Sequence, residues 1–414
     1  MSIIDWFKRL VGAERSEETD VSRTKNGGGG WSSMTSTKNL RKPSRDERFK
    51  PRERMRWGGF RSRPSVMNSK EAARHYSTSL ATGDLTLRRT GTDPEQLERY
   101  GLPRWDDEAD LAEFLGLTRE RLAYFACHRR EDSVNHYVSF RVPKRNGGTR
   151  VIMAPKRELR QLQRRLLREL VDRFPVSEYA HGFRRGRSIR TNAEPHCGKD
   201  LVIRFDLADF FGSVNYFRVR GYLVSLGYGH VVASSLALLM TACERQPVEV
   251  SGEVVHVPVA MRYCVQGAPT SPGVCNAVAS TLDHRLAGLA RKYGYDYTRY
   301  ADDMTFSGDD DRGVGPLLGV VPEIVTDEGF ALNRDKTRVM HSGQHQRVAG
   351  VTVNEVIGLS RRERRKIRAM IHRMKKEREA GTLSEEEVHR LEGKLAYVEM
   401  LNPQQGAALR RQWA

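Results

Sequence analysis

Short runs of apolar residues predict a series of β-strands in the middle of the chain. Residues 137–142 alternate between apolar and polar side chains, as a strand with one covered face does. The Asn-Gly-Gly sequence at 146–148 is typical of a tight turn, and Arg150 with the apolar residues 151–153 follows it. These segments predict a β-hairpin. Residues 201–206 are apolar almost throughout and predict a buried strand that ends at Asp206.

Further strands are expected nearer the C-terminus. Residues 297–300 and 304–307 predict two short strands on either side of Ala-Asp-Asp at 301–303. Residues 248–255 predict a small hairpin that turns at Ser-Gly, and residues 348–354 predict another strand.

Helices are predicted between these strands. Leu159, Leu162 and Leu166 recur at the spacing of one helix face. Residues 273–293 predict one long helix, and the basic region from Leu359 onward predicts further helices.

The first 85 residues show no sustained apolar period. They contain four consecutive glycines at 27–30, many Ser and Thr residues, and several basic stretches. This composition predicts a flexible basic N-terminal tail. Two interpretations of the tail stay open: an arm that binds nucleic acid through interleaved Trp and Phe residues, and a solvated linker.

The charge of the chain favours a polyanionic partner. The 414 residues include 70 Lys+Arg against 52 Asp+Glu, a net charge of +18, so nucleic acid is the first candidate and an acidic membrane surface the second. No apolar run reaches the roughly 18 residues that a membrane span needs, and the start lacks the pattern of a signal peptide. The five cysteines show no metal-ligand spacing. We expect a reduced, cytoplasmic protein without a membrane partner.

Three aspartates are the strongest candidates for chemistry. Asp206 ends the predicted buried strand, and Asp302 and Asp303 lie at the tip between two short strands. Buried carboxylates need a compensating charge, and Mg²⁺ supplies one because it prefers hard oxygen ligands. Two such ions about 4 Å apart activate a 3′-hydroxyl and stabilise a leaving pyrophosphate. An Asp-Asp tip alone is also typical of a polar turn, so the interpretation depends on Asp206 and on the positive charge of the chain.

Basic and backbone groups near these aspartates are suited to a triphosphate. Lys144 and Arg150 flank the predicted Asn-Gly-Gly turn and can clamp phosphates. The backbone N–H groups of the turn after Asp206 can also meet a triphosphate. Lys336 can protonate the departing pyrophosphate. The alternative interpretations are a solvated basic hairpin and an exposed lysine.

Two further segments fit the same pocket. Phe211 can lie under the sugar and crowd a 2′-hydroxyl, although a core aromatic is the alternative interpretation. Gln266 begins a rigid loop, rich in Gly and Pro up to Pro272, that can pass close under a base pair. A plain connector is the alternative for that loop.

The C-terminal region adds a basic helix. Residues 361–368 and 373–378 contain ten basic residues within eighteen positions. Ile367, Met370 and Ile371 give the same helix an apolar stripe. We expect one face of the helix to pack on the protein and the other to lie against nucleic acid, with a merely soluble basic helix as the alternative.

Taken in order, these motifs resemble those of reverse transcriptases. The matching segments are Asp206-x-x-x-Phe-Phe211, Gln266-Gly-x-Pro-x-Ser-Pro272, Tyr300-Ala-Asp-Asp303 and Asn333-x-x-Lys-Thr337, within residues 135–355. The chain is most similar to the bacterial retron type, because Asn192-Ala-Glu-Pro-His196 matches the Asn-Ala-x-x-His element of retron enzymes. Val348-Ala-Gly350 stands where those enzymes usually carry Val-Thr-Gly.

The resemblance implies a right-hand polymerase fold of the α+β class, with a mostly antiparallel sheet in the palm. Its parts would be a flexible tail at 1–85, N-terminal helices and fingers at 86–200, a palm at 201–345 and a helical, basic thumb at 346–414. A further fingers segment, at about 213–263, would be inserted in the palm.

The resemblance also implies roles for individual residues. Asp206, Asp302 and Asp303 would bind two Mg²⁺ ions, with Mn²⁺ as an alternative, and would form the catalytic site with Lys336. The dNTP-binding residues would be Lys144, Arg150, Ala208, Asp209, Phe210, Phe211 (as the sugar gate) and Gln266. The residues that bind template or RNA would be Asn192, His196, Gly267, Gly350, Arg361, Arg365 and Arg368. His196 has a second interpretation, as a structural hydrogen-bonding residue.

Retron enzymes copy a cognate structured RNA, which serves as template and primer. They start DNA from a 2′-hydroxyl of an internal guanosine and yield a branched RNA–DNA hybrid called msDNA, usually together with an effector protein in phage defence. The resemblance therefore implies dNTPs, this RNA, its DNA product and an effector or toxin protein as partners.

Two rival interpretations stay open. One is another bacterial reverse transcriptase, of the group II intron or diversity-generating kind. The other is a non-catalytic RNA-binding scaffold that holds a toxin or effector silent.

Overall fold

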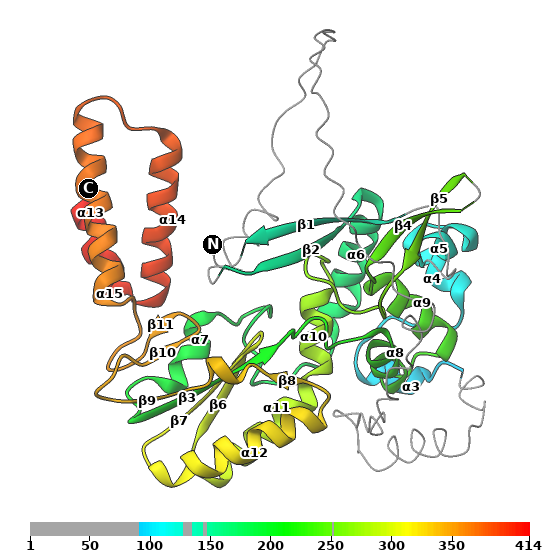
Figure 1. The fold of residues 1–414 in the computed structure, drawn as a ribbon, viewed down its shortest axis with the longest axis horizontal. Helices are drawn as coiled ribbons and strands as arrows, with labels where there is room; N and C mark the ends of the chain where they lie inside the picture. Colours follow the sequence, from blue (N-terminus) through cyan, green and yellow to red (C-terminus); the bar gives the residue numbers. More distant parts are fainter. Residues whose placement is uncertain (1–90, 127–134, 144–146, 251) are drawn as a thin grey trace, which may run out of the picture. The chain divides into compact units, whose positions relative to one another are not determined.

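The computed structural model describes residues 91–126, 135–143, 147–250 and 252–414 (Figure 1). All of these residues belong to one compact unit. The predicted N-terminal tail and Lys144 lie outside the described residues. Among the described helices, none combines the length and apolar character needed to cross a membrane.

The chain alternates helices with short antiparallel strand pairs. The α-helices are α3 (Pro94–Arg99), α4 (Glu108–Leu115), α5 (Arg119–Ala126), α6 (Arg157–Glu169), α7 (Ile189–Ala193), α8 (Tyr216–Ser225), α9 (His230–Met240), α10 (Ser271–Val278), α11 (Ser280–Lys292), α12 (Val314–Asp327), α13 (Arg361–Glu379), α14 (Glu385–Leu401) and α15 (Pro403–Trp413). The strands are β1 (Tyr137–Pro143), β2 (Thr149–Pro155), β3 (Leu201–Ala208), β4 (Arg245–Val250), β5 (Glu253–Pro258), β6 (Asp296–Tyr300), β7 (Asp303–Gly308), β8 (Ala331–Leu332), β9 (Arg338–His341), β10 (Arg347–Val348) and β11 (Val351–Thr352).

A five-stranded sheet forms the centre of the fold. Its strands follow the order β6-β7-β3-β8, and β9 also pairs with β3. Every ladder in this sheet is antiparallel. The predicted α+β class with a mostly antiparallel sheet is therefore confirmed.

The two faces of the sheet differ in chemistry because side chains alternate along each strand. On one face, Ile203, Phe205 and Phe306 are buried in the main hydrophobic core together with apolar residues of α11 and α12, and Figure 1 shows these two helices running beside the sheet. The opposite face carries Asp206 and Asp303, which the register places side by side. One face thus packs in the main core, and the other carries the two aspartates at one end.

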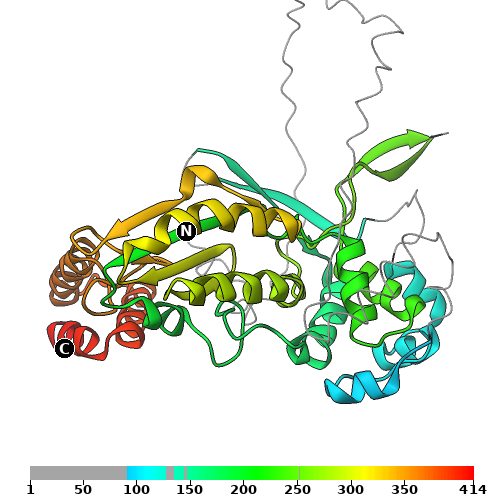
Figure 2. The same ribbon diagram turned by 90° about the horizontal axis from the view of Figure 1, so that it is seen from below.

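Within the described residues, three two-stranded hairpins accompany the sheet. The predicted hairpin at 137–153 is confirmed as β1–β2, and that at 248–255 as β4–β5. Figure 2 shows β4–β5 standing clear of the helices around it. The single strand predicted at 348–354 is wrong. Residues 347–352 instead form the β10–β11 hairpin, because Ala349 and Gly350 both adopt positive φ, at 45° and 91°, as a type I′ turn requires.

The single long helix predicted at 273–293 is also wrong, because it is divided into α10 and α11. The division falls at Ala279, just before Ser280. The Ser280 hydroxyl donates to the Asn276 carbonyl at 3.3 Å and accepts from the Ser177 N–H at 3.2 Å. A serine that bonds back to the preceding turn competes with the helical ladder and bends helices.

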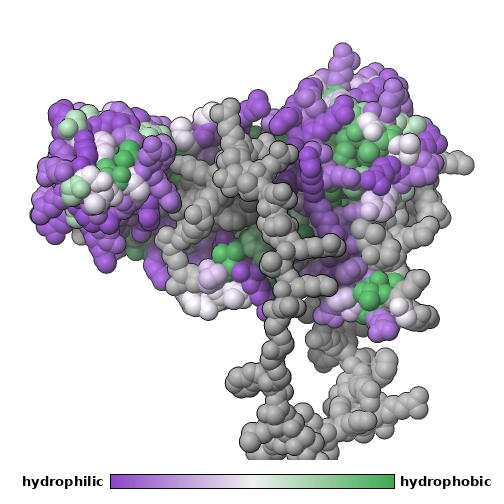
Figure 3. All heavy atoms as spheres, turned by 90° about the horizontal axis from the view of Figure 1, so that it is seen from above, coloured by the Kyte–Doolittle hydropathy of each residue, from purple (hydrophilic) through white to green (hydrophobic). Residues whose placement is uncertain are grey.

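The three C-terminal helices have a hydrophobic core of their own. Seven buried residues form it: Ile367, Ile371, Met374, Leu391, Leu395, Val398 and Leu409. Helix α13 starts with a capping box in which Ser360 and Glu363 bond reciprocally. The predicted apolar stripe is therefore confirmed, and the outer surface of these helices, at the left of Figure 3, is mostly hydrophilic.

Candidate active site

The register of the central sheet brings the three aspartates to one end of β3 and β7. Asp206 lies directly opposite Asp303 across the two strands. Asp302 precedes Asp303 in the β6–β7 turn, and its carbonyl oxygen accepts a hydrogen bond from the Leu207 N–H at 2.8 Å. Residues almost a hundred positions apart in the sequence are neighbours here.

Two basic side chains are paired with these carboxylates. Lys336 Nζ lies 2.9 and 2.8 Å from the two carboxylate oxygens of Asp206. Arg204 Nε and Nη2 donate to the two carboxylate oxygens of Asp303 at 3.1 and 2.5 Å. The sequence singled out Lys336 but not Arg204. The signal was present, since alternation along the strand puts Arg204 and Asp206 on one face.

Mutual repulsion shapes the protonation of this group. Burial raises the pKa of Asp302 to about 6, and the negative charges of Asp206 and Asp303 add to the rise. Burial also raises the pKa of Asp303, while the neighbouring Arg204 guanidinium opposes that rise. Carboxylates that repel one another in a buried position form a site that a cation would stabilise.

The donor set suits a hard divalent ion, because carboxylate oxygens are the ligands that Mg²⁺ prefers. In the part of the chain that the structure describes, however, no three acidic, His or Cys side chains are grouped to hold a metal ion. Asp206 is turned to Lys336 and Asp303 to Arg204. Metal binding by all three carboxylates therefore requires these two contacts to be exchanged for metal contacts.

We expect Asp302→Asn to raise the melting temperature at pH 8 and to leave it unchanged near pH 4. The pKa of Asp302 is about 6 in the folded protein, against an ordinary value of 3.8. Between these values the unfolded chain binds fewer protons, so stability falls as the pH rises. The full difference corresponds to at most about 3 kcal/mol, which the neutral Asn avoids.

Thermal denaturation from pH 4 to pH 8, without added divalent metal, measures this effect. Asp309→Asn, whose exposed carboxylate lies in the loop after β7, is the matched control and should show no such gain. A stability difference that stayed constant over this pH range would contradict the expected burial of Asp302.

The segment after β3 turns sharply. Asp209 has a φ of +45°, and its carbonyl oxygen accepts a hydrogen bond from the Ser213 N–H at 2.9 Å. Ala208, at the end of β3, is half-buried, and Asp209 is exposed. These two of the predicted dNTP-binding positions are therefore open to solvent.

Phe210 and Phe211, the next two residues, are less exposed than Ala208 and Asp209. Phe210 is 3% exposed and stacks on Phe330 with ring centroids 6.0 Å apart. Its side chain belongs to the core, so only the backbone of Phe210 is left for the predicted contact with dNTP. Phe211 is 9% exposed and lies near Phe183, with ring centroids 6.4 Å apart. Sequence alone did not identify Phe183 as its neighbour.

The loop that begins at Gln266 is held by β2. The Gln266 carbonyl oxygen accepts a hydrogen bond from the Met153 N–H at 2.9 Å. Gly267 has a φ of +117°, and a Cβ there would lie 2.7 Å from the Met153 carbonyl oxygen. The close approach of β2 therefore explains the glycine without any template contact. Arg150 is half-buried on the same strand, opposite Val142.

His196 and Asn192 are not placed for direct contact with RNA, which corrects that prediction. His196 is fully buried, with Nδ1 2.7 Å from the Ser307 hydroxyl and Nε2 2.7 Å from the Thr298 hydroxyl. Burial lowers its pKa to about 3, so the ring is neutral. Asn192 is 1% exposed. His196 is thus the structural hydrogen-bonding residue of the second interpretation, and it cross-links β6 and β7.

We expect His196→Ala to lower the free energy of unfolding by about 2–4 kcal/mol, because it leaves a cavity and two buried hydroxyls without their partner. Chemical denaturation measures the loss. His341→Ala removes an exposed imidazole and should change stability little. If His196→Ala kept full stability and lost only RNA binding, the structural assignment would be wrong.

The other predicted RNA-binding residues lie at the surface. Gly350 is in the turn of β10–β11 and is half-buried, whereas Arg361, Arg365 and Arg368 are exposed on α13. These three arginines are therefore available to a polyanion.

Comparison with known proteins identifies the protein family to which this chain belongs. Residues 142–376, more than half of the chain, match the family model described as "Reverse transcriptase (RNA-dependent DNA polymerase)". The chain belongs to this family and is an RNA-directed DNA polymerase with the right-hand polymerase fold. The fold and activity predicted from the motifs are thereby confirmed.

Its relatives narrow the class to the retron reverse transcriptases. The retron Mx65 reverse transcriptase of Myxococcus xanthus is 52% identical over 90% of this chain and 86% of its own length. The retron Mx162 enzyme of the same organism is 42% identical, over 76% of this chain and 68% of its own length. A telomerase structure from Candida albicans, solved with a TWJ fragment of telomeric RNA, aligns with 66% of this chain and 56% of the telomerase chain at 12% identity. The TM-score of this alignment is 0.40, too low to support a conclusion.

Proposed function

We propose that Asp206, Asp302 and Asp303 hold two Mg²⁺ ions, with Mn²⁺ as an alternative, as the catalytic carboxylates of this polymerase. The observation that carries the proposal is the β3–β7 register, which sets Asp206 opposite Asp303 with Asp302 in the adjoining turn. The pKa of Asp302, which is raised by burial and further by the neighbouring carboxylates, supports it, because bound cations would favour the ionised form. When bound, such ions activate the attacking hydroxyl and stabilise the leaving pyrophosphate.

The basic neighbours have separate roles in this proposal. Arg204 opposes the rise in the pKa of Asp303 and so favours its ionised form. Lys336 carries its ammonium group at Asp206, where it is positioned to give a proton to pyrophosphate. When a metal ion is bound by Asp206, the Lys336 ammonium group would no longer be needed as its partner and would be available to the pyrophosphate.

The nucleotide would lie over the segment after β3. The exposed position of Asp209, beside the half-buried Ala208, supports binding of phosphate oxygens there. Arg150 would clamp them from β2, together with Lys144. Phe211 would crowd a 2′-hydroxyl, which selects dNTPs over ribonucleotides, and Gln266 would face the incoming base pair.

The template and primer would be a cognate structured RNA. Its 2′-hydroxyl would start the DNA strand, giving msDNA, as in the retron enzymes that this chain resembles. Exposed Arg361, Arg365 and Arg368 support contact with the phosphates of that RNA. The resemblance alone supports an effector or toxin partner in phage defence. A cytoplasmic location follows from the need for dNTPs and transcript in one compartment.

We expect Asp302→Asn combined with Asp303→Asn to lower DNA synthesis by at least about a thousandfold, because the remaining carboxylate cannot hold two ions. RNA affinity should not change. Primer extension with labelled dNTP and a filter-binding titration measure the two quantities. Asp309→Asn combined with Asp311→Asn removes two carboxylates from the loop that follows β7 and is the matched control.

Nucleic acid extracted from the purified protein separates this proposal from a silent scaffold. Ribonuclease-resistant, branched single-stranded DNA, present with the parent and absent with the double variant, supports retron synthesis. RNA alone with both proteins would favour the scaffold, and full extension by the double variant would overturn the site.

We expect Ala at Arg361, Arg365 and Arg368 to weaken RNA binding and to reduce the log–log salt slope by about 2–3, since each lost phosphate contact contributes about 0.7–0.9. Binding titrations at several salt concentrations give the slope. Ala at Arg119, Arg291 and Arg312, which are also exposed, changes the net charge equally. An equal loss of slope in that control would assign the effect to net charge instead of to α13.

A further inference from the structure

The turn that carries Asp302 has an unusual backbone. Ala301 adopts a φ of +58°, a left-handed conformation that a residue with a Cβ disfavours. Ala301 is 5% exposed, so the surrounding protein, and not solvent, determines this conformation. A strained backbone persists only where neighbouring contacts impose it. The groups around this turn must therefore hold Ala301 in place.

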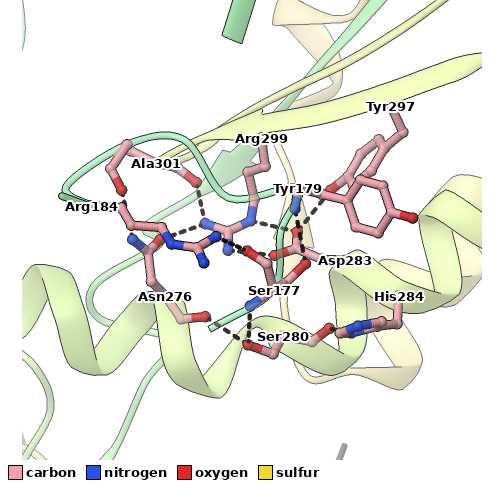
Figure 4. Close-up of polar contacts among 11 residues, drawn as sticks. Ser177, Tyr179, Arg184, Asn276, Ser280, Asp283, His284, Tyr297, Arg299 and Ala301 are labelled. Atoms are coloured by element: carbon pink, nitrogen blue, oxygen red, sulfur yellow. Dashed lines mark hydrogen bonds and ion pairs between the residues drawn. The ribbon is translucent and has the colours of Figure 1, made fainter. Parts of the chain in front are cut away.

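A buried arginine makes the main contact with this turn. Arg299 is fully buried, and its Nη1 donates to the Ala301 carbonyl oxygen at 3.0 Å. Its Nε and Nη2 each donate to Asp283 of α11 at 2.7 Å, and Nη1 also donates to Oδ1 of Asn276 of α10 at 2.9 Å (Figure 4). One guanidinium thus connects two helices to the catalytic turn.

The same network also contacts the turn through Gly182. Asn276 Nδ2 donates to the Gly182 carbonyl oxygen at 2.7 Å. A Cβ on Gly182 would lie 2.7 Å from the Ala301 backbone nitrogen. The His181 N–H donates to the Arg299 carbonyl oxygen at 2.8 Å, beside this contact. Ala301 is therefore enclosed between the guanidinium of Arg299 and the backbone of Gly182.

Stability alone is a weak explanation for such a network. Taking two charges out of water costs about as much as their attraction returns, and apolar residues of similar size often serve as well. Apolar residues, however, cannot hold a carbonyl oxygen in place. The fork of Arg299 binds a carboxylate on one side and the Ala301 carbonyl on the other, which only a planar donor with several N–H groups can do.

We propose that Arg299 is a positioning residue for catalysis, which holds Ala301 in its left-handed conformation and thereby places the Asp302 carboxylate. Asp283 orients the guanidinium, and Asn276 links it to Gly182. The inference rests on the proposed role of Asp302. It adds that the geometry of the metal site is set by a network buried beneath it.

Arg299→Lys tests the proposal, because lysine keeps the charge beside Asp283 but lacks the fork that reaches Ala301. We expect kcat for primer extension to fall on the order of a hundredfold, as small misplacements of reacting groups do. The KM for dNTP should stay the same. Amide hydrogen exchange at residues 300–303, measured without metal, should become faster.

A rescue experiment separates positioning from a general loss of packing. Glycine adopts positive φ without strain, so Ala301→Gly in the Arg299→Lys background should restore kcat by at least about tenfold. The four proteins form a double-mutant cycle, in which the proposal requires the two substitutions to be non-additive. Additive effects would overturn it.

Tyr297→Phe is the matched control. The Tyr297 hydroxyl donates to Asp283 Oδ1 at 3.0 Å, so its removal weakens the same buried ion pair without touching the turn. We expect a lower melting temperature and an unchanged kcat. A loss of kcat in Tyr297→Phe as large as that in Arg299→Lys would show that only the stability of the pair matters, and would overturn the proposal.

A second variant keeps the test decisive if Arg299→Lys does not fold. Asn276→Ala removes the link between Arg299 and Gly182 and should give a smaller loss of kcat that Ala301→Gly also reverses. Asp302→Asn separates the catalytic role of Asp302 from the positioning role of Arg299. Activity in Asp302→Asn would refute the catalytic assignment, whereas an inactive Asp302→Asn together with full activity in Arg299→Lys and Asn276→Ala would refute only the positioning role.

Discussion

Repulsion among three carboxylates at one end of the central sheet is the constraint on which the site depends. The pairing of β3 with β7 brings Asp206 and Asp303 together, and Asp302 joins them in a position buried enough to raise its pKa to about 6. Such a group is tolerated only with positive charge close by. Lys336 and Arg204 supply that charge in this structure, each with a geometry that a bound metal ion would have to replace. The site is therefore prepared for cations by its own electrostatics.

Two kinds of ion pair serve this arrangement. The pairs of Asp206 and Asp303 are partly open to solvent, so their partners can be exchanged during a reaction cycle. The Arg299–Asp283 pair has no solvent exposure, and it lies under the opposite face of the same sheet. Ion pairs that can be exchanged suit carboxylates that bind and release ions. The buried Arg299–Asp283 pair suits a guanidinium that must keep a fixed position. The alternation of side chains along β6 and β7 is what separates the two kinds.

The sequence predicted the strands and the three aspartates because both signals are local. A buried strand that ends in Asp, and an Asp-Asp tip between two short strands, are visible in the order of residues alone. The division of 273–293 into two helices was missed, since it depends on hydrogen bonds of Ser280 with residues as distant as Ser177. The hairpin at 347–352 had a signal in Gly350 that the apolar pattern concealed. Alternation along β3 put Arg204 on the face of Asp206, and a structural role was one interpretation of His196. Their actual partners, Asp303 for Arg204 and Ser307 and Thr298 for His196, could not be predicted, because both depend on which strands become neighbours.

The separate hydrophobic core of α13, α14 and α15 has an evolutionary meaning. Its apolar side chains pack among themselves, whereas the strands that carry the aspartates pack in the main core. Under the proposed function, substitutions on the arginine-rich surface of α13 would therefore change RNA recognition without disturbing the strands that carry the aspartates. Two separate hydrophobic cores would thus let the proposed RNA-binding surface evolve independently of the proposed metal site.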